Sequence, residues 1–137
     1  MQNPSVVLDT NIIVSAHLNP LGLEYRVFEL ALDCRLRLFI SAPILLEYET
    51  VLRRPKFPIL PEKVTESLAQ IRQNGTLVVP TMTLSVSPDE PDNRFLECAE
   101  SAGAGFLVTG NRRHYPSVWR STRIVSAREL VEVVFKV

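Results

Sequence analysis

The sequence has few cysteines and no long apolar run, and these two shortages exclude several classes of protein. Its 137 residues include two cysteines, Cys34 and Cys98, which are too few for a disulfide framework and lack metal-ligand spacing. No apolar run approaches the roughly 18 residues that span a membrane, and residues 1–5 show no secretory signal. We therefore expect a cytoplasmic protein with no membrane association, whose two thiols lie in helical segments at the core or its boundary.

An excess of positive charge is also missing. The chain has 15 lysines and arginines and 15 aspartates and glutamates, so its formal net charge is zero. A dedicated nucleic-acid-binding module usually carries a basic surface. Any nucleic acid must therefore be held by a local basic patch or through a metal ion. The length and the 46% hydrophobic fraction fit one globular domain over residues 1–137.

Strand and helix signals alternate along the chain, which predicts an α/β fold with a mostly parallel central sheet of four to five strands. The apolar runs predict strands at residues 6–8, 36–40, 76–79, 105–109 and 123–125. Periodicity and capping residues predict helices at residues 12–16, 23–34, 42–53, 62–73, from 88 or 91 to 102, and from 127 to about 135.

The first strand ends in an acidic residue, Asp9. The preceding run Val6-Val7-Leu8 has no polar alternation, which is typical of a strand buried on both faces. An ionised carboxylate there is costly to bury without a compensating cation. Because ligands of open parallel sheets gather at the carboxyl ends of the strands, Asp9 is a candidate site residue.

A second acid, Asp92, lies on the apolar stripe of its predicted helix, in phase with Phe95 and Leu96. Acids are common in first turns, where they cap the helix and complement its dipole. The segment from Ser87 to Glu90 already has the form of a capping box, which would satisfy the helix start without Asp92. The cap and a functional site are equally good interpretations of Asp92, whereas we expect Asp89 to be a solvated turn residue.

Two further positions are candidates of lower specificity. Glu47 and Glu49 lie at opposite edges of the apolar face of the 42–53 helix, and periodicity does not choose between them. Asn111 follows the fourth strand as Asp9 follows the first, so neighbouring strands would bring the two together. Gly110-Asn111 is also an ordinary turn pair. An Asn carbonyl oxygen can nevertheless bind a hard cation.

Acids converging from strand ends and helices indicate a Mg²⁺ or Mn²⁺ site, since these ions prefer carboxylate and carbonyl oxygens. Such an ion supports hydrolysis of a phosphodiester by orienting the phosphate and activating water. We expect His17 and His114 to be surface residues rather than general bases, and Tyr115 and Trp119 to pack around the last strand and helix.

These segments together resemble the PIN-domain family. The resemblance covers nearly the whole chain, and its motifs lie at residues 7–11, 45–57, 92–99 and 103–111. It implies a three-layer α/β/α sandwich and a Mg²⁺- or Mn²⁺-dependent ribonuclease. The stretches around Arg54 and Asn111 are most similar to VapC-like toxins of toxin–antitoxin pairs. The resemblance therefore also implies an RNA substrate, a cognate antitoxin and a homodimer.

The positions of Asp9, Glu47 and Asp92 match those of the three acidic residues that occur most regularly in the family. This match selects Glu47 over Glu49. The resemblance implies that Asp9 and Asp92 bind the metal directly and that Glu47 binds it through water or orients the nucleophile. Asn111 departs from the pattern, because many family members have a fourth aspartate there. The loss of that charge makes hydrolysis with two metal ions doubtful.

Basic residues flank these candidates. Arg112, Arg113 and His114 follow Asn111 and would contact RNA backbone, while a second cluster, at residues 53, 54 and 56, follows the Glu47 helix. Two alternatives to a nuclease remain. The chain is a catalytically weak or inactive PIN fold that binds RNA or a partner, or it is a receiver-like signalling domain, for which a well-placed late lysine is lacking.

Overall fold

A computed structural model describes residues 3–135 of the chain. Its elements follow one another as β1 (Ser5–Leu8), α1 (Thr10–Leu18), α2 (Leu23–Leu32), β2 (Arg37–Ile40), α3 (Ala42–Leu52), α4 (Pro61–Asn74), β3 (Thr76–Leu77), the 3₁₀ helix η1 (Glu90–Asp92), α5 (Asn93–Ala102), β4 (Phe106–Val108), the 3₁₀ helix η2 (Arg112–His114), β5 (Val118–Trp119), β6 (Thr122–Val125) and α6 (Ala127–Val134). The predicted α/β class is confirmed.

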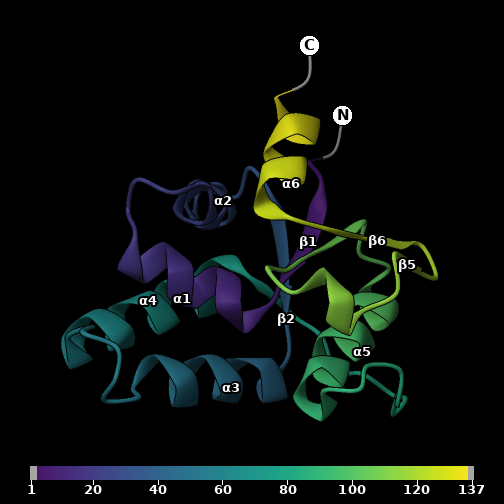
Figure 1. Cartoon of the computed structure of the whole chain (residues 1–137), viewed down its shortest axis with the longest axis horizontal. Helices are drawn as coiled ribbons and strands as arrows, with labels where there is room; N and C mark the ends of the chain where they lie inside the picture. The colour runs from purple at the N-terminus through teal and green to yellow at the C-terminus, as the bar shows by residue number, and fades with distance from the viewer. Residues whose placement is uncertain (1–2, 136–137) are drawn as a thin grey trace.

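The strands form one sheet in the order β3-β2-β1-β4-β6-β5, parallel except for β5. The chain moves from β1 outward to β2 and β3, then returns to the other side of β1 as β4. Parallel connections are right-handed, so this reversal sends α5 to the opposite face from the helices that follow β1 and β2. Helix α5 packs on β1, β2 and β4, whereas α6 packs on β4 and β6 and against α2 (Figure 1). The result is a three-layer α/β/α sandwich.

The reversal of strand order between β1 and β4 is what positions the site. In open α/β sheets, the connections leave such a switch point in opposite directions and open a crevice at the carboxyl ends of the two strands. Val6, Val7 and Leu8 pair with β4 in register and are fully buried. Asp9 and Thr109, the residues that directly follow the two strands, therefore emerge side by side.

Local capping sets several helix starts. Ser41 caps α3, and Pro43 is tolerated in its first turn, as expected. Ser126 and Glu129 form a capping box at the start of α6. Helix α5 ends at Gly103, whose φ of 64° is the left-handed conformation that glycine adopts most easily. Helix α1 is longer than predicted because the side chain of Asp9 caps it one residue after the strand.

The sheet has six strands rather than the four to five predicted. The missed strand, β5, pairs antiparallel with β6 through a tight hairpin in which Arg120 has a φ of 56°. Hairpins with left-handed residues usually carry glycine or asparagine there, and Arg120-Ser121 is neither, so no turn signal is visible in the sequence. Cys34 was also predicted wrongly. It is exposed and follows the end of α2, with a φ of 59°, whereas Cys98 is buried as expected.

The start of α5 differs from the prediction as well. No capping box forms between Ser87 and Glu90. The Ser87 hydroxyl accepts a hydrogen bond from the Asp89 amide, and the Glu90 carboxylate accepts one from the Asn93 side chain. A 3₁₀ turn precedes the helix, which begins at Asn93. Among the helices of residues 3–135, none combines the length and apolar character that a bilayer crossing requires.

Candidate active site

Asp9 is a buried acid held by three short hydrogen bonds and by a longer one, which the Asn11 side chain donates to Oδ2 at 3.4 Å. Its side chain is at the carboxyl end of β1 and the residue is 4% exposed. The Thr10 amide donates to Oδ1 at 2.7 Å, while the Thr109 hydroxyl and the Tyr115 hydroxyl donate to Oδ2 at 2.8 and 3.0 Å. Burial raises the pKa of Asp9, although these hydrogen bonds act in the opposite direction. These donors therefore orient the carboxylate without fully compensating the cost of burying its charge.

Glu47 faces Asp9 from α3. The Thr10 hydroxyl donates to Glu47 Oε2 at 3.2 Å, and the charge of Glu47 contributes to the raised pKa of Asp9. Glu49, in contrast, forms an ion pair with Arg53 at 3.0 Å. Tyr48, the residue after Glu47, is fully buried. Its hydroxyl donates to the backbone carbonyl of Leu8, and this hydrogen bond connects α3 to the end of β1. The structure thus brings Glu47, and not Glu49, to the end of the first strand.

Asp92 is buried at the start of α5 but makes no capping hydrogen bond. The Asp92 side chain therefore does not cap the helix through a hydrogen bond. Burial raises the pKa of Asp92 to about 6, with a further increase from the negative charge of Asp9. His114 Nδ1 lies 3.0 Å from Asp92 Oδ2 and acts in the opposite direction. Asp9 and Asp92 are thus close enough to repel each other.

Asn111 lies beyond β4, as expected from the strand order. Its amide donates to the Thr109 hydroxyl at 3.0 Å, and the preceding Gly110 amide donates to the Asn11 side chain at 2.9 Å. The same Thr109 hydroxyl donates to Asp9. These contacts join the residues after β1 to those after β4, so Asn111 and Asp9 share one edge of the sheet.

All four predicted catalytic positions line one cavity of about 570 Å³, which we term the acidic cavity. Its wall is formed by Asp9, Thr10, Asn11, Val14, Ser15, Glu47, Val51, Arg54, Lys56, Phe57, Asp89, Pro91, Asp92 and Asn111. The predicted ligands are therefore neighbours in space. Burial, and to a smaller extent the charges of neighbouring carboxylates, raise the pKa values of Asp9 and Asp92. These carboxylate oxygens form a donor set that a hard divalent cation fits.

The predicted nucleic-acid residues are distributed differently from the expectation. Arg112 and Arg113 are exposed and line a separate hollow of about 270 Å³, and Arg112 pairs with Glu129 of α6. His114 is half-buried against Asp92 rather than free on the surface. Two other basic side chains, Arg54 and Lys56, line the acidic cavity itself.

Several residues at the site were missed by sequence reasoning. Tyr115 is buried and its hydroxyl contacts Asp9, whereas we expected it only to pack near the last strand. Thr109 had a usable signal, because it follows a buried strand just as Asp9 does. Tyr115 had none, since its approach to Asp9 depends on the path of η2. Asp89 was expected to be a simple turn residue, yet it lies 3.7 Å from His114.

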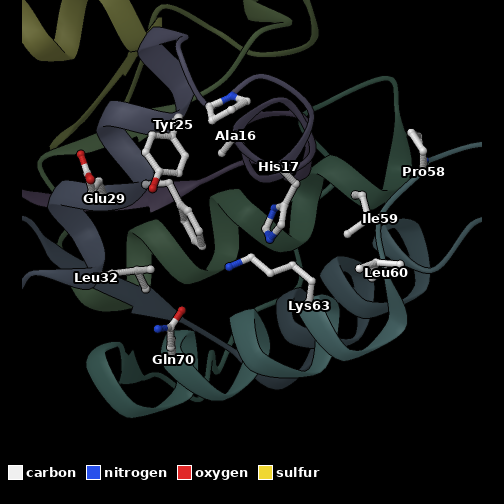
Figure 2. Close-up of a pocket in the computed structure, with 12 residues that line it drawn as sticks. Ala16, His17, Tyr25, Glu29, Leu32, Pro58, Ile59, Leu60, Lys63 and Gln70 are labelled. Carbon is white, nitrogen blue, oxygen red and sulfur yellow. The ribbon is translucent and has the colours of Figure 1, made fainter.

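A second cavity lies away from these acids, between α1, α2 and α4, and also has a volume of about 570 Å³ (Figure 2). Its wall is largely apolar and aromatic. We expected His17 to be a surface residue, but its side chain points into this cavity. Its Nδ1 contacts the Ile13 carbonyl at 2.8 Å, and its Nε2 contacts the Ser67 hydroxyl at 2.7 Å. With both nitrogens engaged, this histidine is structural, and Glu29 is the one acid among the described residues that line this cavity.

A sheet with a strand reversal beside a buried aspartate, and three further polar side chains around one cavity, match what the sequence motifs predicted. The family model of the PIN domain matches residues 5–113, and the chain belongs to the PIN-domain family.

The similarity of this chain extends to individual proteins. The chain is 26% identical over 110 residues to the uncharacterized protein MJ1680 of Methanocaldococcus jannaschii, a match covering 78% of this chain and 70% of that protein. In structure it resembles VapBC2 from Rickettsia felis bound to a DNA fragment from their promoter, with a TM-score of 0.57 and 18% identity. That match covers 88% of this chain and 98% of the other, and it shows a shared fold.

Proposed function

We propose that this protein is a metal-dependent endoribonuclease that hydrolyses phosphodiester bonds in RNA. The observation that carries the proposal is the acidic cavity, in which Asp9, Glu47 and Asp92 meet at the strand reversal of a PIN-domain sheet. A bound cation would stabilise the ionised forms of these buried carboxylates, whose pKa values are raised. A metal-dependent nuclease requires a cation at the place where these carboxylates meet.

In this proposal, Asp9 and Asp92 hold Mg²⁺ or Mn²⁺, and Glu47 binds it through water or orients the nucleophile. When bound, the ion orients the scissile phosphate, lowers the pKa of a water molecule and stabilises the leaving oxygen. Thr10 fixes both acids, because its amide donates to Asp9 and its hydroxyl to Glu47. Tyr115 keeps Asp9 in one rotamer by donating to Oδ2.

The basic side chains would position the RNA. Arg54 and Lys56 lie on the wall of the acidic cavity, where they can contact the phosphates on either side of the scissile bond. Arg112 and Arg113 would contact nucleotides farther along, over the neighbouring hollow. His114 is the one member of the predicted group in direct contact with a candidate metal ligand.

We further propose that the protein is the toxin of a toxin–antitoxin pair. The sequence motifs resemble those of VapC-like toxins, and the fold is shared with a VapBC2 structure. The proposal includes a cognate antitoxin as partner, a homodimer and a cytoplasmic location for the single domain spanning residues 1–137.

The second candidate function is a PIN fold that binds RNA or a partner with weak or no catalysis. One observation favours it. Asn111 occupies the position on the acidic cavity where many family members carry a fourth acid, so the site has one fewer negative charge to hold metal ions. The variant Asn111→Asp restores that charge and is the direct test of whether it limits activity.

The deciding experiment is cleavage of a mixed RNA pool in Mn²⁺, Mg²⁺ or EDTA, with single-stranded DNA as a second substrate. Asp9→Asn is assayed in parallel, and Glu49→Gln is the matched control, because Glu49 belongs to the same helix as Glu47 but pairs with Arg53. The proposal expects metal-dependent RNA products with the wild type and the control, and none with Asp9→Asn. Products that persist in Asp9→Asn, or no products in any metal even from Asn111→Asp, would contradict it.

A further inference from the structure

Two carboxylates from the wall of the acidic cavity converge on one imidazole. His114, at the end of η2, places Nδ1 at 3.0 Å from Asp92 Oδ2 and at 3.7 Å from Asp89 Oδ2. The three ligand atoms all lie within 4.8 Å of one another. Asp89 directly precedes η1 and Asp92 ends it, before α5, whereas His114 ends η2, after β4. The fold therefore brings them together from positions more than twenty residues apart in the sequence.

The charges of this cluster are not balanced by protein groups. Nδ1 carries at most one proton, and that proton can be donated to only one of the two carboxylates. Among residues 3–135, the ion pairs of Asp89 and Asp92 are those with His114, and neither carboxylate pairs with a lysine or an arginine. The Asp92 side chain is nevertheless nine-tenths buried. A divalent cation in place of the shared proton would contact all three groups and neutralise both carboxylates.

We propose that Asp89, Asp92 and His114 bind a second divalent cation of the first transition row, such as Zn²⁺, Co²⁺ or Mn²⁺, through Oδ2, Oδ2 and Nδ1. The inference rests on the proposed function in one respect, which is that Asp92 is shared with the cation held by Asp9. Asp89 is half exposed, so water completes the coordination. This ligand set would provide a second cation position even though Asn111 stands where many family members have a fourth acid.

The nitrogen ligand sets the metal preference of the new position. Imidazole suits Zn²⁺ and the other later ions of the first transition row, whereas Mg²⁺ favours oxygen ligands and retains its water. We therefore expect Zn²⁺ to be coordinated by His114, and Mg²⁺ not to be coordinated by this imidazole. For coordination through Nδ1, the remaining proton of the ring must be on Nε2.

The chain supplies its own control for a direct test. It has two histidines, and His17 lies in the other cavity with both ring nitrogens engaged (Figure 2). Long-range ¹H–¹⁵N correlation spectra of the untagged protein resolve the two imidazoles. On titration with Zn²⁺, we expect the Nδ1 resonance of His114 to move to that of a metal ligand with the Nε2–H tautomer, while His17 does not change. Mg²⁺ held by Asp9 and Asp92 can shift His114 through its contact with Asp92, but it should not move Nδ1 to the resonance of a metal ligand, and His17 should not change.

Variants then separate the two cation positions. Asp89→Asn should weaken Zn²⁺ binding in calorimetry by at least about tenfold, the lower end of what loss of even an outer-shell partner costs, and Glu49→Gln should not. Asp9→Asn should keep the Zn²⁺ response of His114, which would support the inference even if the RNA cleavage assay failed. If Zn²⁺ stabilises the protein but His114 does not respond, the inference is wrong and the proposed nuclease stands. If neither Zn²⁺ nor Mn²⁺ binds, both are wrong.

Discussion

Replacement of Asp92 by asparagine should stabilise the protein when no metal is bound. Asp92 is buried close to the negative charge of Asp9, and its pKa is raised from 3.8 to about 6. Asparagine has nearly the same shape and can still accept a hydrogen bond from His114. The substitution therefore removes an unfavourable charge while it keeps the packing at the start of α5.

The magnitude follows from the pKa. A rise from 3.8 to about 6 means that the fold disfavours the ionised carboxylate by about 3 kcal/mol. Since the group lies at the wall of an open cavity, solvent screens part of this cost, and we expect Asp92→Asn to recover about 1–2 kcal/mol. For a domain of this size, 1 kcal/mol corresponds to about 3 °C, so the Tm should rise by about 3–6 °C at pH 8.

The raised pKa of Asp92 determines how its effect on the free energy of unfolding changes with pH. Because the folded protein binds the proton of Asp92 more tightly than the unfolded chain does, ionisation destabilises the fold as the pH rises from about 4 to about 6. The cost is complete above that window and absent below it. The gain in Asp92→Asn should therefore be full at pH 8 and nearly absent at pH 4.

Thermal unfolding in EDTA at pH 8 and pH 4 measures this effect, with Glu49→Gln as the control for a mere loss of charge. Saturating Mn²⁺ should reverse the order at pH 8, because metal at about 100 times its Kd stabilises the wild type by about 2.7 kcal/mol and the variant has lost a ligand. A Tm of Asp92→Asn below that of the wild type in EDTA at pH 8, or an equal change at both pH values, would refute the reasoning.

Three further predictions concern other residues. Tyr48→Phe leaves the buried Leu8 carbonyl without its donor and should lower the free energy of unfolding by about 1–2 kcal/mol in urea denaturation; an unchanged value would contradict it. Burial lowers the pKa of His17, so stability should fall as the pH drops below about 6.5, and His17→Gln should weaken that fall in urea series. Lys56→Ala should weaken RNA binding and reduce its salt dependence in filter binding; an unchanged salt slope would exclude a phosphate contact.

The order of elements was predictable because apolar runs and caps are local signals. Val6-Val7-Leu8 and Ser126 place a strand and a helix start from a few residues each. The hairpin of β5 was missed because Arg120 takes a left-handed conformation that its residue type does not favour. The start of α5 was misplaced because the Ser87 and Glu90 side chains bond to other partners.

The candidate site was predictable only in part, for a related reason. The strand order follows from connection rules, so the meeting of Asp9 and Asn111 was foreseeable. The resemblance, rather than periodicity, selected Glu47. The contacts of Tyr115 and His114 depend on the course of η2 after β4, and nothing local in the sequence specifies that course. The metal and RNA roles of these residues remain predictions.

Glu129 links the far end of the chain to the rim of the acidic cavity. Its carboxylate accepts from the Ser126 amide at the start of α6 and also from Arg112, the first residue of η2. Two residues later, η2 presents His114 to Asp92. Truncation of α6, or a fusion that displaces it from the sheet, would therefore break the contact between Glu129 and Arg112 that helps to position His114. Engineered versions of this protein should keep residues 126–134 undisturbed.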